Sequence, residues 1–328
     1  MKVAVLGTGR ALPAHSRDSF QIDLDLKTGN RVSSSRVNRR FICREETQID
    51  LARTASLAAL ESAKQKPSDL DLIISGASVP YQPIPATAPL IMRSLGIPDG
   101  VAAAFDVNST CLSFISALEI AGLMINNGTV RRALVVSSEI ASRALPWEKQ
   151  PEVAALFGDG AGAFVLGPAH TASPSAIKAV RLRSYPSVFE ACGIGSGGTK
   201  YDFDTEHDAF VANSKFTMDG KVLFRLTAQK FNQFVNDLLE QAGWKQSDVD
   251  LVVPHQASPA ALDHLIRLTG FDRTQVVSIV EDYGNQIAAS IPFTFDIASE
   301  RNLLTLGRKV LLLGTSAGVS FGGAALVI

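Results

Sequence analysis

The chain has 328 residues, 46% of them apolar, which is enough for a large core and, at about 150 residues per domain, predicts two domains. Lysine and arginine total 31 against 32 aspartates and glutamates, so a net charge of −1 argues against binding nucleic acid or an anionic membrane through overall charge. Three cysteines at wide spacings argue against a disulfide scaffold and favour a reducing, cytoplasmic environment.

The first predicted strand, residues 3–7, is followed by glycines and an arginine, and this start is too short and too polar for a signal peptide. Two later stretches, 72–92 and 310–328, carry no charge. The first contains four prolines and the second four glycines, so both predict buried strands and turns, with no membrane-spanning helix.

Further short apolar runs predict buried strands, and stretches with helical periodicity lie between several of them. The strands are expected at 70–75, 132–138, 162–167, 249–254 and 309–314, and the clearest helices at 48–65 and 221–242. This alternation predicts an α/β layered fold. The irregular segment 168–211 is predicted to be a connection with a surface loop.

Two pairs of segments resemble each other at nearly equal offsets. Residues 68–74 match 247–253, and residues 131–137 match 308–314. Acidic caps before strands could explain one match, but two at similar offsets favour two copies of one unit. We therefore expect two halves, 1–170 and 171–328, with the ligand site between them.

Cys111 follows a short strand that ends near Val107 and precedes an apolar helix. The partial positive charge at a helix N-terminus stabilises a thiolate, so this position predicts a lowered pKa and a nucleophilic sulfur. A free cysteine beside an apolar helix can equally be an inert core residue.

Two further polar residues lie at positions where catalytic side chains are expected. His255 follows the predicted strand 249–254, and side chains at the carboxyl ends of such strands face the ligand crevice. Asn285 lies in a turn that enters a helix of small residues. Each also has a structural interpretation, as a satisfied histidine and as a helix cap or turn residue.

Taken together, the segments TCLSF, PHQAS and YGNQIAAS resemble the Cys, His and Asn signatures of the β-ketoacyl-acyl carrier protein synthase III type of condensing enzyme, in the thiolase-like superfamily. The resemblance covers nearly the whole chain, including LFGDGAGAFVLG at 156–167 and the glycine-bearing C-terminal segment. It implies an αβαβα fold built from two pseudo-repeated halves, a homodimer, and no metal or cofactor.

The resemblance also implies a reaction. Cys111 would accept an acyl group from an acyl-CoA or acyl carrier protein thioester, and a malonyl thioester would lose CO₂ and attack the acyl-enzyme. His255 and Asn285 would stabilise the negative charge on the malonyl thioester oxygen. The backbone N–H groups of Cys111 and Ala317 would form a second oxyanion site.

Five arginines lie between residues 31 and 44. Such clusters are usually solvated surface, but in the family this region borders the pantetheine tunnel. The candidate substrate-binding residues, for coenzyme A phosphates or an acidic carrier protein, are Arg36, Arg39, Arg40 and Ser258.

Departures from the family pattern leave alternatives open. Leu112 and Ser113 replace the usual small residues after the cysteine, which favours a specialised fatty acid or secondary-metabolite pathway. Ile84 stands where long-chain head-to-head condensing relatives have a catalytic glutamate, so that activity ranks lower. The alternatives are an acyltransferase that moves the acyl group to an alcohol or amine, and a non-catalytic partner of an active homologue.

Overall fold

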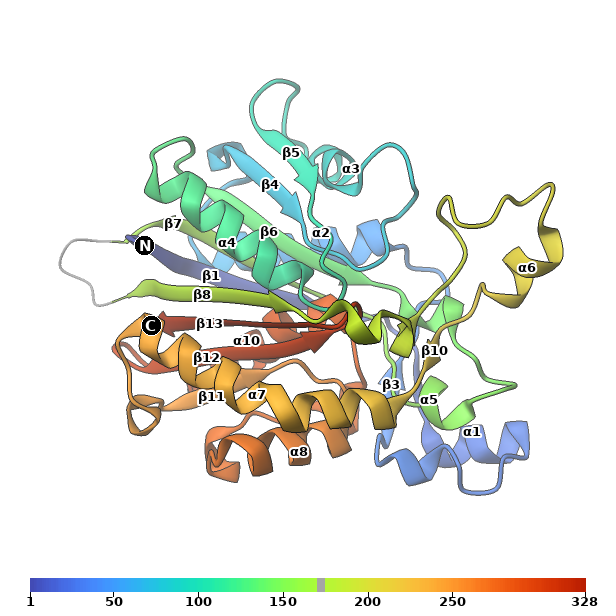
Figure 1. The fold of residues 1–328 in the computed structure, drawn as a ribbon. Helices are drawn as coiled ribbons and strands as arrows, with labels where there is room; N and C mark the ends of the chain where they lie inside the picture. Colours follow the sequence, from blue (N-terminus) through green and yellow to red (C-terminus); the bar gives the residue numbers. More distant parts are fainter. Residues whose placement is uncertain (170–174) are drawn as a thin grey trace.

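The computed structural model describes residues 1–169 and 175–328, and these residues form two large β-sheets that alternate with three layers of helices (Figure 1). This arrangement confirms the predicted αβαβα class. The predicted boundary between the halves, at residues 170 and 171, lies outside the described residues and stays a prediction.

The N-terminal sheet has the strand order β1-β7-β6-β4-β5. Strands β4, β5 and β6 are parallel, so their carboxyl ends lie at one edge of the sheet. The strands are β1 (Val3–Ala11), β4 (Leu72–Ser75), β5 (Ala103–Asp106), β6 (Ala133–Glu139) and β7 (Gly160–Pro168).

The second sheet has the order β11-β12-β13-β8. Its members are β8 (Ala176–Ser184), β11 (Leu251–Pro254), β12 (Lys309–Ser316) and β13 (Ser320–Val327). Strand β8 lies inside the segment 168–211, where the sequence predicts a connection with a surface loop, so the prediction misses this strand. Its residues alternate between apolar and charged side chains, whereas the predicted buried strands were recognised as continuous apolar runs.

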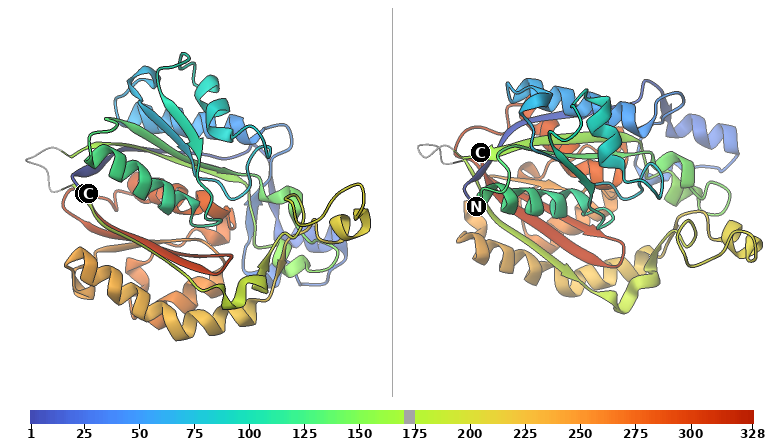
Figure 2. Two further views of the ribbon diagram at one scale, coloured as in Figure 1. Left: turned by 45° about the horizontal axis from the view of Figure 1, so that its top comes forward. Right: turned by 90° about the horizontal axis from the view of Figure 1, so that it is seen from above.

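Helices α4 (Ser113–Asn126) and α10 (Ser290–Glu300) form the middle layer and contact both sheets. Helices α2 (Gln48–Ser62) and α3 (Thr87–Ser94) cover the outer face of the first sheet, and α7 (Gly220–Ala242) and α8 (Pro259–Thr269) lie outside the second. Figure 2 shows this stacking from two further directions.

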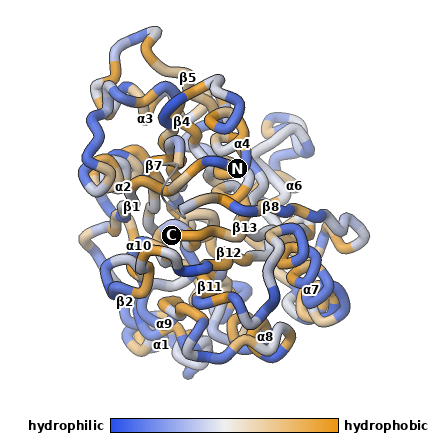
Figure 3. Tube along the Cα trace, turned by 90° about the vertical axis from the view of Figure 1, so that its left-hand side faces the viewer, coloured by the Kyte–Doolittle hydropathy of each residue, from blue (hydrophilic) through white to orange (hydrophobic). Residues whose placement is uncertain are grey.

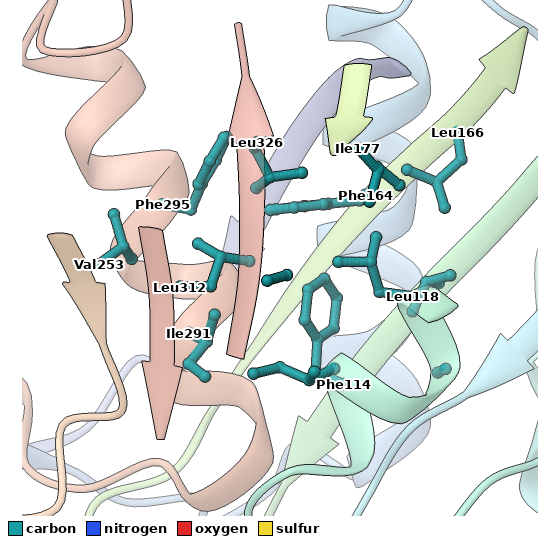
Figure 4. Packing of buried hydrophobic residues seen from close by; sticks show 14 of the residues in the cluster. Phe114, Leu118, Phe164, Leu166, Ile177, Val253, Ile291, Phe295, Leu312 and Leu326 are labelled. Carbon is teal, nitrogen blue, oxygen red and sulfur yellow. The ribbon is translucent and has the colours of Figure 1, made fainter. Parts of the chain in front are cut away.

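The core lies between the two sheets around α4 and α10. Figure 3 shows that β13 is mainly hydrophobic, whereas the outer helix α7 also carries hydrophilic residues. At the centre, Phe164 packs edge-on against Phe114 at 4.8 Å between ring centroids and also contacts Phe295 (Figure 4). These rings come from β7, α4 and α10, so one aromatic contact chain ties both middle helices to the first sheet.

Helix α2 packs closely against strand β1 of the first sheet. A capping box of Thr47 and Asp50 begins the helix. A Cβ on Gly9 of β1 would lie 2.4 Å from the carbonyl oxygen of Ala55 in α2, so only glycine permits this approach of strand and helix. Gly9 therefore serves the close packing of β1 against α2.

Shorter elements gather beyond the carboxyl ends of the strands, and the segment that carries α6 projects away from the body (Figure 2). They are β2 (Ser16–Asp18), α1 (Ser19–Leu26), β3 (Arg39–Phe41), α5 (Pro151–Ala154), β9 (Cys192–Gly193), α6 (His207–Ala212), β10 (Thr217–Met218) and α9 (Val280–Tyr283). Throughout residues 1–169 and 175–328, every helix is too short or too polar to cross a bilayer.

Candidate active site

Cys111 lies in the turn between β5 and α4, two residues before the helix begins at Ser113. Thr110 has a φ of 54°, a left-handed conformation that turns the chain sharply before the cysteine. The Oγ of Ser113 accepts a hydrogen bond from the N–H of Ser109 at 2.9 Å and closes the turn. The predicted position, at the entrance to a helix, is therefore correct.

The pKa predicted for this thiol is wrong in direction. Burial of the sulfur raises the pKa of Cys111 to about 12, and the neighbouring Cys192 and Glu139 side chains add to the rise. Hydrogen bonds from the backbone N–H groups of Ala317 and Cys111 act in the opposite sense and lower the pKa by less. Loss of hydration outweighs the stabilising N–H groups because the sulfur is enclosed between segments of both halves.

Glu139 is a neighbour of the nucleophile that the sequence did not identify. It is the last residue of β6 and only 1% exposed. Its Oε1 accepts a hydrogen bond from the N–H of Ser78 at 2.5 Å, and its Oε2 has no hydrogen-bond partner among the described residues. Burial raises the pKa of Glu139 to about 8, so the carboxyl is mostly protonated at neutral pH.

His255 is the first residue after β11, as its position in the sequence predicts. The backbone N–H of His255 donates to the carbonyl oxygen of Leu313 in β12 at 2.7 Å. A Cβ on the neighbouring Gly314 would lie 2.9 Å from Cδ2 of Leu112 and 3.1 Å from Cβ of His255. Leu112, which follows Cys111, and His255 therefore both pack against Gly314 of β12.

The imidazole of His255 is held in the interior and is 5% exposed. Its Nδ1 lies 2.6 Å from the Oγ of Ser290, the first residue of α10. Burial lowers the pKa of His255 to about 4, so the ring is neutral at pH 7. The adjacent Gln256 anchors the loop, since its side-chain amide donates to the carbonyl oxygens of Pro254 and Val277.

Asn285 lies between α9 and the short helical turn 287–289, and its backbone N–H donates to the carbonyl oxygen of Leu156 at 2.7 Å. Its Oδ1 accepts from the N–H of Ile287 at 2.8 Å, which is the turn-capping role. Its Nδ2 donates to the carbonyl oxygen of Ala257 at 3.3 Å, two residues beyond His255. One amide proton makes that bond, so within residues 1–169 and 175–328 the second is left for another acceptor.

Three segments that are distant in the sequence are thus linked. Cys111 contacts the turn at Ala317 after β12, His255 lies against β12, and Asn285 is bonded to the histidine loop. The set contains a thiol, a neutral imidazole and a carboxamide. Such a set can form a covalent thioester and donate hydrogen bonds to an oxyanion without a strong base.

The arginines and Ser258 occupy different environments. Arg40 is fully buried and donates to the Oγ of Ser19 at 2.6 Å, so it differs from the surface contact that was expected. Arg36 forms an ion pair with Asp263 at 2.7 Å, and Arg39 lies over the ring of Phe41. The Oγ of Ser258 caps α8 by accepting from the N–H of Ala261.

Comparison with known proteins places these features in a family. Residues 105–186 match the model described as 3-oxoacyl-[acyl-carrier-protein] synthase III, and residues 239–328 match the model of its C-terminal part. The chain is 34% identical over 98% of its length to β-ketoacyl-[acyl-carrier-protein] synthase III 3 of Streptomyces coelicolor, covering 95% of that protein. It is 32% identical to the synthase III of Rhizorhabdus wittichii, with 99% of each chain covered.

Solved structures agree with this result. The crystal structure of 3-oxoacyl-(acyl carrier protein) synthase III from Pseudomonas aeruginosa PAO1 superposes with a TM-score of 0.88 and 30% identity. The match covers 100% of this chain and 98% of the other. The similarity therefore includes both sheets and all three helical layers.

Proposed function

Because the chain belongs to the 3-oxoacyl-[acyl-carrier-protein] synthase III family of condensing enzymes, we propose that it joins an acyl group carried on Cys111 to a malonyl thioester. The observation that carries this proposal is the grouping of the thiol with the Ala317 N–H, the His255 loop and Asn285. The product would be a β-ketoacyl thioester.

In the first half-reaction, the sulfur of Cys111 attacks the carbonyl carbon of an acyl thioester. A C–S bond to Cys111 forms, the C–S bond of the donor breaks, and the cysteine proton leaves with the donor thiol. The N–H groups of Cys111 and Ala317, which both act to lower the pKa of the thiol, would also stabilise the oxyanion of the tetrahedral intermediate.

In the second half-reaction, the malonyl thioester loses CO₂, and the electron pair of the broken C–C bond becomes an enolate. The enolate attacks the acyl carbonyl and forms the new C–C bond, the C–S bond to Cys111 breaks, and the departing thiolate takes up a proton from solvent. Decarboxylation generates the carbanion, so the step needs hydrogen-bond donors and not a base. The neutral ring of His255 and the free amide proton of Asn285 supply them.

The acyl donor and the malonyl carrier are proposed from the names of the relatives, which specify an acyl carrier protein. Arg36 and Arg39, two of the exposed cations of the arginine-rich segment, would meet an acidic carrier protein or coenzyme A phosphates. Because Leu112 and Ser113 replace the usual small residues after the nucleophile, we place the reaction in a specialised fatty acid or secondary-metabolite pathway.

A second candidate is transfer of the Cys111-bound acyl group to an alcohol or amine, which shares the first half-reaction. A non-catalytic partner subunit ranks below both, because the cysteine, histidine and asparagine are all present. Neither condensation nor heteroatom transfer requires a resident metal or organic cofactor.

We also propose that the protein is a homodimer. Strand β5 lies at an edge of the N-terminal sheet, where its outward N–H and C=O groups can pair with another strand. Tyr81, Ile84 and Val101 lie in the segments that flank β4 and β5 and are 44%, 86% and 47% exposed, so apolar side chains accompany the open edge.

Intact-mass spectrometry after exposure to a panel of acyl thioesters tests the proposal. The wild type should gain one acyl mass, and Cys111→Ala should gain none. His255→Ala and Asn285→Ala should keep acylation but lose roughly 10²–10³-fold in condensation with a malonyl thioester, the usual effect of losing an oxyanion donor. Persistent labelling of Cys111→Ala, or equal losses in both steps, would contradict the assigned roles.

A further inference from the structure

The orientation of the catalytic imidazole depends on one hydroxyl group. Ser290 is fully buried at the start of α10, and its Oγ lies 2.6 Å from Nδ1 of His255. In the described residues, His255 makes its side-chain hydrogen bond through this nitrogen. The direction of the hydrogen bond between Ser290 and Nδ1 therefore decides whether Nε2 donates or accepts, and the inference rests on the proposed function.

A neutral imidazole carries one proton, on either Nδ1 or Nε2. If Nδ1 holds the proton, Nε2 is an acceptor and would repel a thioester oxygen that is gaining negative charge. If Nδ1 accepts from Ser290, the proton is on Nε2 and the ring can donate to that oxygen. The proposed condensation requires the second arrangement.

The geometry around Ser290 favours the hydroxyl as the donor. The Ser290 Oγ and Nδ1 of His255 are 2.6 Å apart, within hydrogen-bond distance, and the hydroxyl can turn about its C–O bond to aim its proton at the ring. The N–H of Gln256 also points at the Ser290 Oγ, at 3.3 Å, and uses one of its lone pairs.

One competing acceptor is present. The carbonyl oxygen of Ile287 lies 2.9 Å from the Ser290 Oγ and could take the hydroxyl proton. However, that carbonyl already accepts from the backbone N–H of Ser290, so it stays satisfied when the hydroxyl turns to the ring. The imidazole nitrogen has no such second donor among the described residues.

We infer that Ser290 is a positioning residue: its hydroxyl donates to Nδ1 of His255 and thereby holds the ring proton on Nε2, where it meets the substrate oxygen. Ser290 does not touch the reacting atoms and transfers no proton. Cysteine acylation proceeds without it, whereas decarboxylation and C–C bond formation depend on it.

The test compares Ser290→Ala, which removes the hydroxyl, with Ser290→Thr, which keeps it. Ser56→Ala is the matched control, because Ser56 is also fully buried and bonds a helix carbonyl, that of Ala52, away from the site. Ser290→Ala should be acylated at the wild-type rate but lose roughly 10- to 100-fold in condensation, less than a deleted donor. Ser290→Thr should recover most of this loss, and Ser56→Ala should show none.

A spectroscopic measurement distinguishes positioning from general destabilisation. In protein labelled with ¹⁵N-histidine, the His255 signals, assigned by their loss in His255→Gln, should report the Nε2–H tautomer in the wild type. Ser290→Ala should increase the Nδ1–H form. A wild-type ring protonated on Nδ1, or an unchanged tautomer and condensation rate in Ser290→Ala, would overturn the inference. The spectra keep their meaning if Cys111 is never acylated, an outcome that would instead refute the proposed function.

Discussion

At Cys111, two opposing influences act on one sulfur atom. The N–H groups of Ala317 and Cys111 favour the thiolate, while burial, Cys192 and Glu139 disfavour it. The helix start beside Cys111 is visible in the order of residues, whereas the part of Ala317 is implied only by the family resemblance. The second influence depends on segments from both halves that enclose the sulfur, and no local pattern records them.

The charge on Glu139 is expected to add to the effect of burial on the ionisation of the nucleophile. In Glu139→Gln, no anion can form beside the sulfur, so the pKa of Cys111 should fall and its alkylation should begin at lower pH. We expect alkylation of Cys111 by iodoacetamide near pH 8 to be roughly threefold faster or more, since the thiolate is the nucleophile. Peptide mass spectrometry would follow Cys111 separately from Cys43 and Cys192.

Glu119→Gln is the control for this experiment. Glu119 lies on α4 and its pKa is also raised by burial, but it is not among the groups that raise the pKa of Cys111. Its replacement should leave the alkylation profile of Cys111 in place. A profile of Glu139→Gln that is unchanged, or displaced to higher pH, would show that the carboxylate does not act on the sulfur.

The residues of the site differ in how far their positions can be predicted from the sequence. The positions of Cys111 and His255 after strands, and of Asn285 in a turn before a helix, are visible in the sequence, and the structure links their segments. Ser290 and Glu139 act on partners 35 and 28 residues away, so only the fold makes those contacts visible. Arg40 looks like a surface cation in the sequence, yet it lies in the interior.

Among the elements, β12 connects the nucleophile and the histidine. Gly314 leaves room for Leu112 on one side and His255 on the other. Gly322 of the neighbouring β13 also faces Leu112, since a Cβ there would lie 3.0 Å from both of its δ carbons. The absence of a side chain at Gly314 and at Gly322 therefore determines how closely the Cys111 and His255 loops approach each other.

A methyl group on β12 should separate these loops. In Gly314→Ala, the new Cβ would displace Leu112 and His255, so we expect both half-reactions to slow by roughly tenfold or more, because small displacements of reacting groups are costly. Overpacking should also lower the free energy of unfolding by about 1–3 kcal/mol. Rates of acylation and condensation, together with urea unfolding, would measure these effects.

Gly198→Ala is the comparison, because a Cβ at Gly198 would have no other heavy atom within 4 Å. That variant should retain wild-type rates and stability. Normal kinetics in Gly314→Ala would mean that β12 does not set the distance between the loops.

The elements found from sequence and the one missed differ in a physical way. Strands buried on both faces, such as β6 and β12, are continuous apolar runs. Strand β8 carries charged residues on one face, where Arg181 pairs with Asp237 of α7 at 2.6 Å. An alternating strand inside an irregular segment resembles a loop unless its partner strand, β13, is known.

For the whole molecule, the two sheets repeat one order. Reading from β1, the first sheet runs β1-β7-β6-β4, and reading from β8, the second runs β8-β13-β12-β11. The matched sequence segments fall on corresponding strands, β4 with β11 and β6 with β12. The first sheet has an additional strand, β5, beyond this common set, and that strand leaves an open edge.

The open edge of β5 leads to a prediction about assembly. The N–H groups of Ala103 and Val107 donate to Asp71 and Ser75, toward β4. Because successive N–H groups of a strand point to opposite sides, the N–H of Ala104 points outward, away from β4. Ala104→Pro therefore removes an outward donor and preserves the ladder to β4, as prolines on edge strands do.

If two copies pair through β5, Ala104→Pro should weaken the dimer by roughly tenfold or more, a loss of about 1.4 kcal/mol or above. Ala104→Val adds similar bulk but keeps the N–H, so it should remain dimeric at the same protein concentration. Sedimentation equilibrium would give both dissociation constants, and circular dichroism would establish that each variant is folded. A wild type that sediments as a monomer would refute the dimer, and equal dissociation constants for the two variants would place its interface away from the β5 edge.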